Sequence, residues 1–516
     1  MITVFPPILK YRAATHPERI AYLFEGTAYT YQNYYSQASQ AATYLQSLGL
    51  KKGDRIGILD LNNNHVVNLV TGALLIGVIP VSVNWRAMPQ DLLFVISDAD
   101  IEHFFYGAAF SKLIAATPLS DRVKLRQLEK IVDHSGSLKK TDTDNTPFAD
   151  DICAILYTSG TTGNPKGVML TYTNLFSCYH LCVSDTPAFG PDSRNLVCGP
   201  LYSIFGFGSF FAGIYSGATN VLLKMFDPVQ ICSSITNDKV THAVLVPIMF
   251  RLILSIPGVE EMDFSSLRHI QYGGSPVSGP VLQKISTIFK CEFTQVYGLT
   301  ETSGVATALR FDDHRKILGS EDINTNILLL SAGKPGLGVE IKILDEDGNA
   351  VSENIPGEIF IKGEIVTKGY WKKPEISEKV FNNNGWFSTG DIGYLNEDGY
   401  LFLVDRKNDM IVSKGLNIYP AEIEKIIELY PGFKEVAVIG IPDDKAGEAI
   451  CAVAVLKNGA VELEHLQEWC IGKIAEHKIP KRLEITTELP RNATGKVLRR
   501  LIRDPFWVNE QRKIKG

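Results

Sequence analysis

The segment from Tyr157 to Gly167 concentrates residue types that bind anions. Its eleven residues include four Ser or Thr hydroxyls, three glycines and one lysine, Lys166. Glycines let backbone N–H groups turn toward an anion, hydroxyls add donors, and the lysine supplies positive charge. The pattern therefore favours a phosphate-binding loop over a flexible surface loop. It is not a Walker A loop, because Pro165 precedes the lysine and a glycine follows it.

Four further segments carry the residue types that a nucleotide site uses. Tyr272–Pro276 follows a strand-like run, and its glycines would let the backbone approach a flat ligand. Gln295–Thr302 offers an aromatic face, a hydroxyl and a carboxylate, and Trp386–Asp391 places an acid after a glycine turn. Pro490–Lys496 places a lysine at a tight turn near the C-terminus. Each segment alone is explained equally well by an ordinary turn or core, so only the whole set points to a nucleotide.

In order and spacing, these five segments resemble the adenylate-forming superfamily of acyl-CoA synthetases, peptide-synthetase adenylation domains and firefly luciferase. The resemblance runs from Tyr157 to Lys496 and is weaker toward the N-terminus, at Thr30 and Tyr31. It implies that a carboxylate attacks the α-phosphorus of ATP to give an acyl-adenylate and pyrophosphate. A thiol then takes the acyl group and releases AMP. The cofactors implied are ATP, Mg²⁺ and coenzyme A.

The resemblance also assigns roles to single residues. The residues that would hold the β- and γ-phosphates of ATP belong to the first segment: Thr158, Ser159, Thr161, Thr162 and Lys166. The residues that would surround the adenine are Gly274, Ser275 and Pro276, with Tyr297 stacked on the ring. Thr300 would contact the α-phosphate, and Glu301 would be the metal ligand for Mg²⁺. Asp391 would accept hydrogen bonds from the ribose hydroxyls, with Arg406 beside it.

Catalysis in such a site is mainly electrostatic. A carboxylic acid is ionised at pH 7 and needs no general base, so the main obstacle is the approach of two anions. The residues implied to stabilise the developing charge are Lys496, Arg406, Thr300 and Glu301. Lys496 would reach the bridging oxygens between the carboxylate and the α-phosphate.

A small mobile C-terminal domain is implied as well. Residues 1–405 would form a large N-terminal adenylation domain with a β-rich part at about 335–405, and residues 406–410 would form a hinge around Asn408. Residues 411–516 would rotate so that Lys496 serves the first half-reaction. In the second, a channel for pantetheine would form from Ser413, Lys414 and Gly415. Relatives often carry Asp or Lys at the hinge, so Asn408 gives the hinge no charge-based support.

The acyl group is expected beside a charge-free stretch, Asn195–Leu223. The residues assigned to its pocket are Ser203, Phe205, Gly206, Phe207 and Gly208. The stretch contains no Asp or Glu to pair with an ammonium group, which disfavours an amino-acid substrate. Its apolar side chains and glycines favour a fatty acid over an aryl acid. Many relatives have His or an aromatic residue at the position of Ser203, so no role is carried over to that serine.

Coenzyme A is the expected acceptor, and an acyl carrier protein is the chief alternative because both end in pantetheine. Luciferase-like oxygenation is a distant third. A non-catalytic adenylate sensor is a further alternative, which the presence of Lys166, Glu301, Arg406 and Lys496 disfavours.

Two kinds of element are expected to position these residues. In the first part of the chain, short strands alternate with helices, as at Gly53–Leu59 and Val66–Gly77, which predicts parallel sheets with crossover helices. From Val339, apolar and polar residues alternate and predict antiparallel strands joined by Asp-Gly turns. The last part has its own helices, predicted at Ala421–Leu429 and Leu463–Glu476. The fold class is therefore α/β with a separate α+β C-terminal part.

Composition excludes several classes of protein. The 516 residues include 51 Lys and Arg against 57 Asp and Glu, a net charge of −6, which gives no global reason to bind nucleic acid. Eight cysteines are too few for a disulfide scaffold, and none has zinc-site spacing, so a cytoplasmic setting is expected. Glycines and a proline interrupt Asn195–Leu223, which predicts a buried helix there rather than a membrane span. The oligomeric state is left open.

Overall fold

The structure is a computed structural model that describes residues 4–119, 122–131, 147–158, 165–184, 186–381, 384–414, 416–443, 445–491 and 497–508. Backbone contacts divide the chain into two units. Unit 1 comprises Met1–Glu340 and Ile361–Phe387, and unit 2 comprises Ile341–Phe360 and Ser388–Gly516. Five of the predicted site residues lie outside the described residues: Ser159, Thr161, Thr162, Gly415 and Lys496.

The main element of unit 1 is a nine-stranded sheet in the order β15-β14-β13-β12-β11-β9-β10-β1-β2. Its strands are β1 (Ile20–Phe24), β2 (Thr27–Thr30), β9 (Arg194–Val197), β10 (Thr219–Leu222), β11 (His242–Leu245), β12 (His269–Gly273), β13 (Glu292–Tyr297), β14 (Thr307–Leu309) and β15 (Lys334–Pro335). The run β13-β12-β11-β9-β10-β1 is parallel. The remaining pairs, β1–β2 at one end of the sheet and β13–β14 and β14–β15 at the other, are antiparallel. The predicted parallel sheet is therefore confirmed.

A second sheet and a hairpin complete the strands of unit 1. The sheet is parallel, in the order β4-β3-β5-β6, and the hairpin pairs β7 with β8. The bounds are β3 (Arg55–Leu59), β4 (Ile79–Ser82), β5 (His103–Tyr106), β6 (Lys124–Gln127), β7 (Ile152–Thr158) and β8 (Lys166–Thr171).

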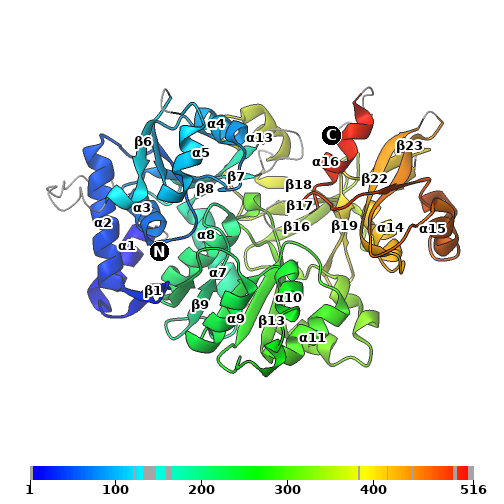
Figure 1. The fold of residues 1–516 in the computed structure, drawn as a ribbon, viewed down its shortest axis with the longest axis horizontal. Helices are drawn as coiled ribbons and strands as arrows, with labels where there is room; N and C mark the ends of the chain where they lie inside the picture. The colour runs from blue at the N-terminus through cyan, green and yellow to red at the C-terminus, as the bar shows by residue number, and fades with distance from the viewer. Residues whose placement is uncertain are drawn as a thin grey trace. The chain divides into compact units, whose positions relative to one another are not determined.

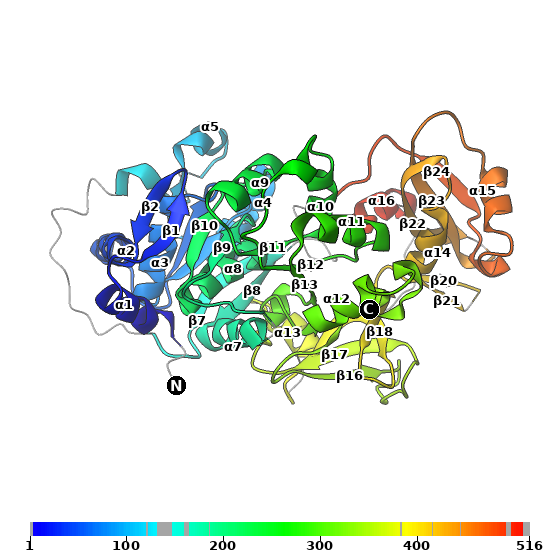
Figure 2. The same cartoon turned by 90° about the horizontal axis from the view of Figure 1, so that it is seen from below.

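Helices precede, connect and follow the strands of unit 1. They are α1 (Phe5–Thr15), α2 (Tyr31–Ser47), α3 (Asn64–Leu75), α4 (Pro89–Asp98), α5 (Ser111–Ala115), α7 (Tyr172–Ser184), α8 (Ile204–Ser216), α9 (Pro228–Asn237), α10 (Pro247–Leu254), α11 (Gly279–Phe289), α12 (Phe311–Leu318) and α13 (Pro374–Val380). Figures 1 and 2 show α8 on one face of the large sheet and α9, α10 and α11 on the other. The parallel strands are therefore covered on both faces, as such sheets require.

Helix α8 occupies the middle of the charge-free stretch. It begins after Ser203 and ends at Gly217, which adopts φ 81° as a left-handed C-cap. Phe207, Phe210 and Phe211 are buried in the core that α8 shares with α1. The predicted buried helix is confirmed, and within the described residues no helix is long and apolar enough to cross a membrane. The cytoplasmic setting stays a prediction.

Unit 2 contains most of one sheet and all of a second one, in which β24 is parallel to β23 and the other pairs are antiparallel. The first, in the order β16-β17-β18-β19, has the strands β16 (Glu340–Leu344), β17 (Gly357–Lys362), β18 (Trp386–Leu395) and β19 (Leu401–Arg406). The second, in the order β21-β20-β23-β22 with β24 beside β23, has the strands β20 (Ile411–Ser413), β21 (Leu416–Ile418), β22 (Phe433–Asp443), β23 (Gly447–Leu456) and β24 (Arg482–Ile485). The strands predicted beyond Val339 are confirmed.

Among its described residues, unit 2 has the α-helices α14 (Pro420–Ile427), α15 (Leu463–Cys470) and α16 (Arg499–Arg503). Helix α15 ends six residues before the predicted Glu476. The reason is Gly472, whose φ of 74° lies in the left-handed region that ends helices. All eight cysteines of the chain are described, and none forms a disulfide. Among the described residues, no group of His, Cys, Asp and Glu could hold a metal ion by itself.

Buried histidines give unit 1 a pH-dependent stability. Nδ1 of His314 lies 3.0 Å from the Arg310 carbonyl oxygen, and Nε2 of the same ring accepts a hydrogen bond from the Tyr272 hydroxyl at 2.8 Å. His269 bonds to Thr294 at 2.9 Å. Burial lowers the pKa of His269 to about 3 and the pKa of His314 to about 4, from an ordinary 6.5. Both rings are therefore neutral in the folded protein at pH 6.

The expected result is a loss of stability as the pH falls from about 6.5 to 4. In this window the unfolded chain takes up protons that the folded chain does not, and each histidine lowers the free energy of unfolding by about 1.4 kcal/mol per pH unit. Urea unfolding between pH 7 and 5 measures the slope. The H314Q variant should lower this slope by the equivalent of about one bound proton, whereas H16Q, which replaces an exposed histidine, should leave the slope unchanged. An unchanged slope in H314Q contradicts the assignment.

Candidate active site

The β7–β8 hairpin carries the ends of the predicted phosphate loop. Thr158, the last residue of β7, lies opposite Lys166, the first residue of β8. The hydroxyl of the preceding Tyr157 donates to Asp98 Oδ2 at 2.7 Å, and the other oxygen of Asp98 accepts from Lys373 Nζ at 2.7 Å. The hairpin is therefore held to α4 and to the segment around residue 370.

Tyr370 lies between two of the predicted site residues. Its hydroxyl donates to Glu301 Oε1 at 2.8 Å, and Lys166 Nζ lies 5.1 Å from the centre of its ring. Burial, together with the neighbouring Glu301 carboxylate, raises the pKa of Tyr370 well above its usual value. The hydroxyl therefore stays protonated and remains a donor to Glu301.

The backbone around Tyr370 is fixed by the same elements. Tyr370 forms a bridge with Val168 of β8, and the N–H of Trp371 donates to the Gly167 carbonyl at 2.8 Å. The N–H of Thr367 donates to the carbonyl of Glu301 at 2.9 Å. Only 7% of the Tyr370 surface is exposed. Lys166 and Glu301 therefore both lie beside the side chain of Tyr370, whose position is restricted by these backbone contacts and by its burial.

The carboxyl ends of β12 and β13 supply a second part of the site. These strands are parallel neighbours, so the residues that follow them meet at the same edge of the sheet. Gly274, Ser275 and Pro276 follow β12 and are exposed, and Gly274 has φ 84°, with the side chain of Val246 3.8 Å from where a Cβ would stand. Strand β13 ends at Tyr297, and the one-turn helix Thr300–Thr302 follows it.

These residues are suited to a nucleotide with a bound divalent cation. Lys166 offers positive charge, Glu301 offers a carboxylate of the kind that hard cations prefer, and the exposed glycine edge can accept a flat ring. The carboxylate is already oriented by the hydroxyl of Tyr370, so a cation would meet an ordered ligand. The donor set therefore agrees with the predicted ATP and Mg²⁺.

Asp391 and Arg406 face each other in unit 2. They are opposite residues of the antiparallel pair β18–β19, and Arg406 Nε lies 3.2 Å from Asp391 Oδ1. The aspartate is 8% exposed, and its own N–H donates to the Thr389 hydroxyl at 3.0 Å. The structure thus confirms that these two residues lie side by side. Their roles toward a ribose are still predictions.

The hinge and channel residues lie further along unit 2. Asn408 belongs to a turn in which the N–H groups of Asp409 and Met410 donate to the Arg406 carbonyl at 3.0 and 3.1 Å. Ser413 ends β20 and pairs with Gly447, while the N–H of the exposed Lys414 donates to the Ala446 carbonyl at 2.8 Å. Ser413 and Lys414 therefore lie beside the turn that joins β22 to β23.

The predicted pocket residues at the start of α8 point in different directions. Ser203 donates its hydroxyl to the Pro200 carbonyl at 2.9 Å, and Phe205 covers Gly199. Phe207 is buried against Phe211, with ring centres 4.6 Å apart, and so belongs to the core behind the helix. Gly206 and Gly208 also differ: a Cβ on Gly206 would lie 2.4 Å from two carbonyl oxygens, whereas on Gly208 its nearest neighbour is Ile204, 3.7 Å away.

Two residues with a place in the site were not singled out in the sequence. Tyr370 had one signal, an aromatic pair with Trp371 directly after Gly369. Ile204 had none beyond its apolar type. Its side chain lies 3.2 Å from where a Cβ would stand on Gly304, three residues after Glu301. The first turn of α8 therefore reaches the turn that carries the predicted metal ligand.

Comparison with known families shows which family the chain belongs to. Residues 9–371 match the model of the AMP-binding enzyme family, and residues 422–496 match the model of the AMP-binding enzyme C-terminal domain. The chain belongs to the AMP-binding enzyme family. The predicted membership of the adenylate-forming superfamily is confirmed.

Several relatives cover nearly the whole chain. The fatty acid–[acyl-carrier-protein] ligase ScoC of Streptomyces coeruleorubidus is 32% identical over 98% of this chain and 96% of its own. The long-chain-fatty-acid–CoA ligase FadD13 of Mycobacterium tuberculosis is 32% identical over 97% of this chain and 98% of its own. The o-succinylbenzoate coenzyme A synthetase of Bacillus subtilis, solved in complex with ATP and magnesium ion, has a TM-score of 0.85 at 30% identity, covering 96% of this chain and 98% of its own.

Proposed function

We propose that this chain is an ATP-dependent ligase that converts an apolar carboxylic acid to an acyl-adenylate and then to a thioester of coenzyme A. The observation that supports this most directly is the convergence of Lys166 and Glu301 on Tyr370. A cation for phosphate oxygens and an oriented carboxylate for a metal are the minimum that a Mg²⁺-bound triphosphate needs.

In the first half-reaction the residues of unit 1 bind ATP. Thr158 and Lys166, with the loop between them, hold the β- and γ-phosphates, and Glu301 holds Mg²⁺ while Thr300 contacts the α-phosphate. Bound Mg²⁺ supplies neutralisation of the triphosphate charge. The adenine lies on Tyr297 beside Gly274, Ser275 and Pro276.

The remaining groups come from the C-terminal half of the chain. Asp391 accepts hydrogen bonds from the ribose hydroxyls, and Arg406 and Lys496 stabilise the negative charge between the incoming carboxylate and the α-phosphate. We propose residues 406–410 as the hinge and residues 411–516 as the rotating domain. Ser413, Lys414 and Gly415 then line the path of the pantetheine thiol in the second half-reaction.

The substrate is proposed to be a fatty acid. The apolar side chain of Ile204 reaches the Glu301 turn, Gly208 lies in contact with Ile204, and the stretch around them contains no charged residue. The two relatives that act on fatty acids support this choice. An aryl acid is the second candidate, since o-succinylbenzoate is the substrate named for a relative of the same fold.

Coenzyme A is the proposed acceptor, on the ground that CoA ligases are among the relatives. An acyl carrier protein is the second candidate, favoured by the relative ScoC. Both present pantetheine, so the same channel residues serve either one.

Exchange of labelled pyrophosphate into ATP tests the proposal. The purified chain with Mg²⁺ should catalyse exchange only when a carboxylate is added, and acids of short, medium and long chain and an aryl acid should differ in rate. Thioester formation with coenzyme A and with a loaded carrier protein then separates the acceptors. Absence of exchange with every acid, from protein that binds ATP, would leave the non-catalytic sensor as the better explanation.

Two neighbouring glycines give a test of the acyl pocket. G208L should lower exchange with long-chain acids about tenfold or more while exchange with short acids changes little, because a Cβ at residue 208 meets only Ile204, at an ordinary contact distance of 3.7 Å, and the larger side chain would extend into the proposed pocket. Exchange rates across a series of chain lengths measure this. The control is G208A, which should keep both stability and chain-length preference.

Gly206 should behave in the opposite way. In G206A the methyl group meets the carbonyls of Gly199 and Pro200, and such overpacking should cost about 1–3 kcal/mol of stability. If G208L lowers exchange with all acids equally, Gly208 does not line the pocket.

A further inference from the structure

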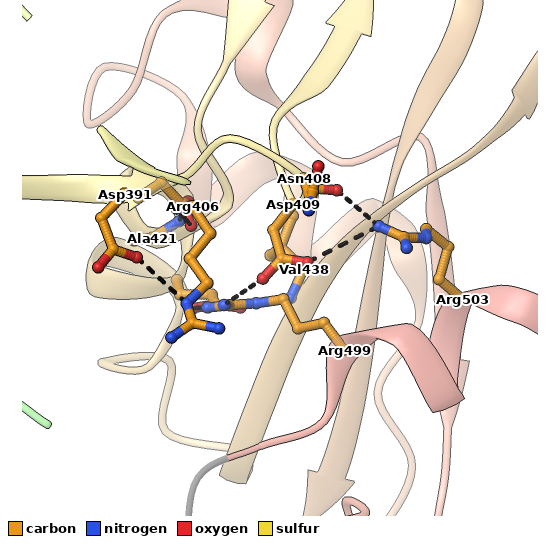
Figure 3. A network of polar contacts seen from close by, with 10 residues as sticks. Asp391, Arg406, Asn408, Asp409, Ala421, Val438, Arg499 and Arg503 are labelled. Atoms are coloured by element: carbon orange, nitrogen blue, oxygen red, sulfur yellow. Dashed lines mark hydrogen bonds and ion pairs between the residues drawn. The ribbon is translucent and has the colours of Figure 1, made fainter. Parts of the chain in front are cut away.

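A network of four charged side chains and two backbone groups joins the proposed hinge to helix α16 of unit 2 (Figure 3). Arg499, the first residue of α16, binds Glu424 of α14 with both Nε, at 3.0 Å, and Nη2. Glu424 Oε1 also accepts from the backbone N–H of Val438 in β22 at 2.7 Å. One bidentate ion pair thus connects α16, α14 and β22.

The same helix holds the turn of the hinge. Arg499 Nη1 lies 3.5 Å from Asp409 Oδ2, and Arg503 Nη1 lies 3.7 Å from Asp409 Oδ1. Arg503 Nη1 also donates to the backbone carbonyl of Asn408 at 2.9 Å. The side chains of Arg499, Glu424, Asp409 and Arg503 are only 12–17% exposed, so water competes little for these contacts.

The position of Arg499 in the chain gives the network its significance. Arg499 lies three residues after Lys496. The residues on either side of 492–496 contact each other: Arg491 forms a β-bridge with Val497, and the N–H of Leu498 donates to the Pro490 carbonyl at 2.8 Å. The two ends of the lysine-bearing segment are therefore fixed to each other, and Arg499 fixes them to the body of unit 2.

We propose that Arg499 is a positioning residue for adenylate formation. Its bidentate ion pair with Glu424 and its contact with Asp409 join the residues that follow Lys496 to the turn of the hinge. A rotation at residues 406–408 would then move the lysine together with the rest of the C-terminal domain. The inference rests on the proposed function, and it concerns a residue that would touch neither ATP nor the acid.

A guanidinium is required because the contact is bidentate. R499K keeps the positive charge but cannot bind both oxygens of Glu424 in a planar fork and still reach Asp409. A displacement of the lysine by about 1 Å is enough to lower a rate by up to 10²-fold. The second half-reaction does not use Lys496 and should be spared.

The test measures the two half-reactions separately in the full-length chain. In R499K, kcat for pyrophosphate exchange should fall about 10- to 100-fold, with KM for ATP changed less than about twofold. Thioester formation from supplied acyl-adenylate should stay within about twofold of the unchanged chain. E424Q, which removes the partner charge, should give the same split, and the double variant should be no worse than the poorer single one.

R500K is the matched control. Arg500 is the next residue of α16, and its pairing is with Asp504, four residues away at 3.7 Å. Its exchange rate should equal that of the unchanged chain. Amide hydrogen exchange over Leu498–Arg503 should rise in R499K and E424Q and not in R500K, which shows directly that the helix has been loosened.

The outcomes are distinct. Equal loss of both half-reactions in a folded R499K chain, or no loss of either, overturns the positioning role while leaving the proposed function in place. Absence of exchange in the unchanged chain overturns the proposed function instead. A tenfold or greater selective loss of exchange in R499K, reproduced by E424Q, supports the inference.

Discussion

Replacing Lys496 by alanine is expected to lower carboxylate-dependent pyrophosphate exchange by about 10²–10³-fold. The reason is that the lysine stabilises negative charge as two anions meet, and removing one such preorganised donor costs about that much. Lys496 lies outside the described residues, so the expectation rests on the resemblance of Pro490–Lys496 and on the C-terminal family match, which ends at residue 496. Single-turnover acyl-adenylate formation measures the effect.

The same K496A chain should still convert supplied acyl-adenylate and coenzyme A to the thioester at nearly the original rate. K481A, at an exposed lysine of the same unit, is the control and should leave both half-reactions within about twofold. If K496A loses both half-reactions equally, the division of labour between the two poses is wrong.

Replacing Glu301 by glutamine is expected to lower exchange by about 10²-fold and to raise the Mg²⁺ concentration needed for half-maximal rate. Glutamine keeps the shape of the side chain and removes its charge, so the loss reports metal binding and the charge stabilisation that follows from it. A Mg²⁺ titration of the exchange rate at saturating ATP measures it. An unchanged Mg²⁺ dependence would show that Glu301 is not the metal ligand.

Replacing Tyr370 by phenylalanine is expected to have a smaller effect of the same kind as E301Q. Y370F keeps the ring beside Lys166 and removes the hydroxyl that donates to Glu301 at 2.8 Å. Loss of one hydrogen bond to a charged group predicts about a tenfold lower rate, with the Mg²⁺ requirement shifted in the same direction as in E301Q. Y394F is a suitable control, since Tyr394 stacks on Phe402 in unit 2.

Local patterns predicted the elements of the fold where one period dominated. Alternating apolar and polar residues marked the strands that became β16, β17 and β19. The ends of elements were predicted less well. The helix predicted at Leu463–Glu476 ends at Cys470.

The parts of the site that sequence reasoning missed depend on distant partners. Tyr370 acquires its role only because it bridges Val168 and contacts Glu301, residues far away in the chain. Arg499 likewise pairs with Glu424, 75 residues earlier, and Asp409, 90 residues earlier. No local spacing marks such contacts, whereas Asp391 and Arg406 were placed together because the resemblance already related them.

Helix α8 has a consequence for how enzymes of this kind diverge. Two glycines two residues apart differ in their tolerance for a side chain: a Cβ on Gly206 would clash with backbone carbonyls, whereas a Cβ on Gly208 would make only an ordinary contact with Ile204. If Gly208 lines the acyl pocket as proposed, a substitution at the first glycine costs stability whatever the substrate, while a substitution at the second changes the fit of the acid. We therefore expect chain-length preference to diverge through residue 208, and a directed-evolution library for new acids should begin there and leave residue 206 untouched.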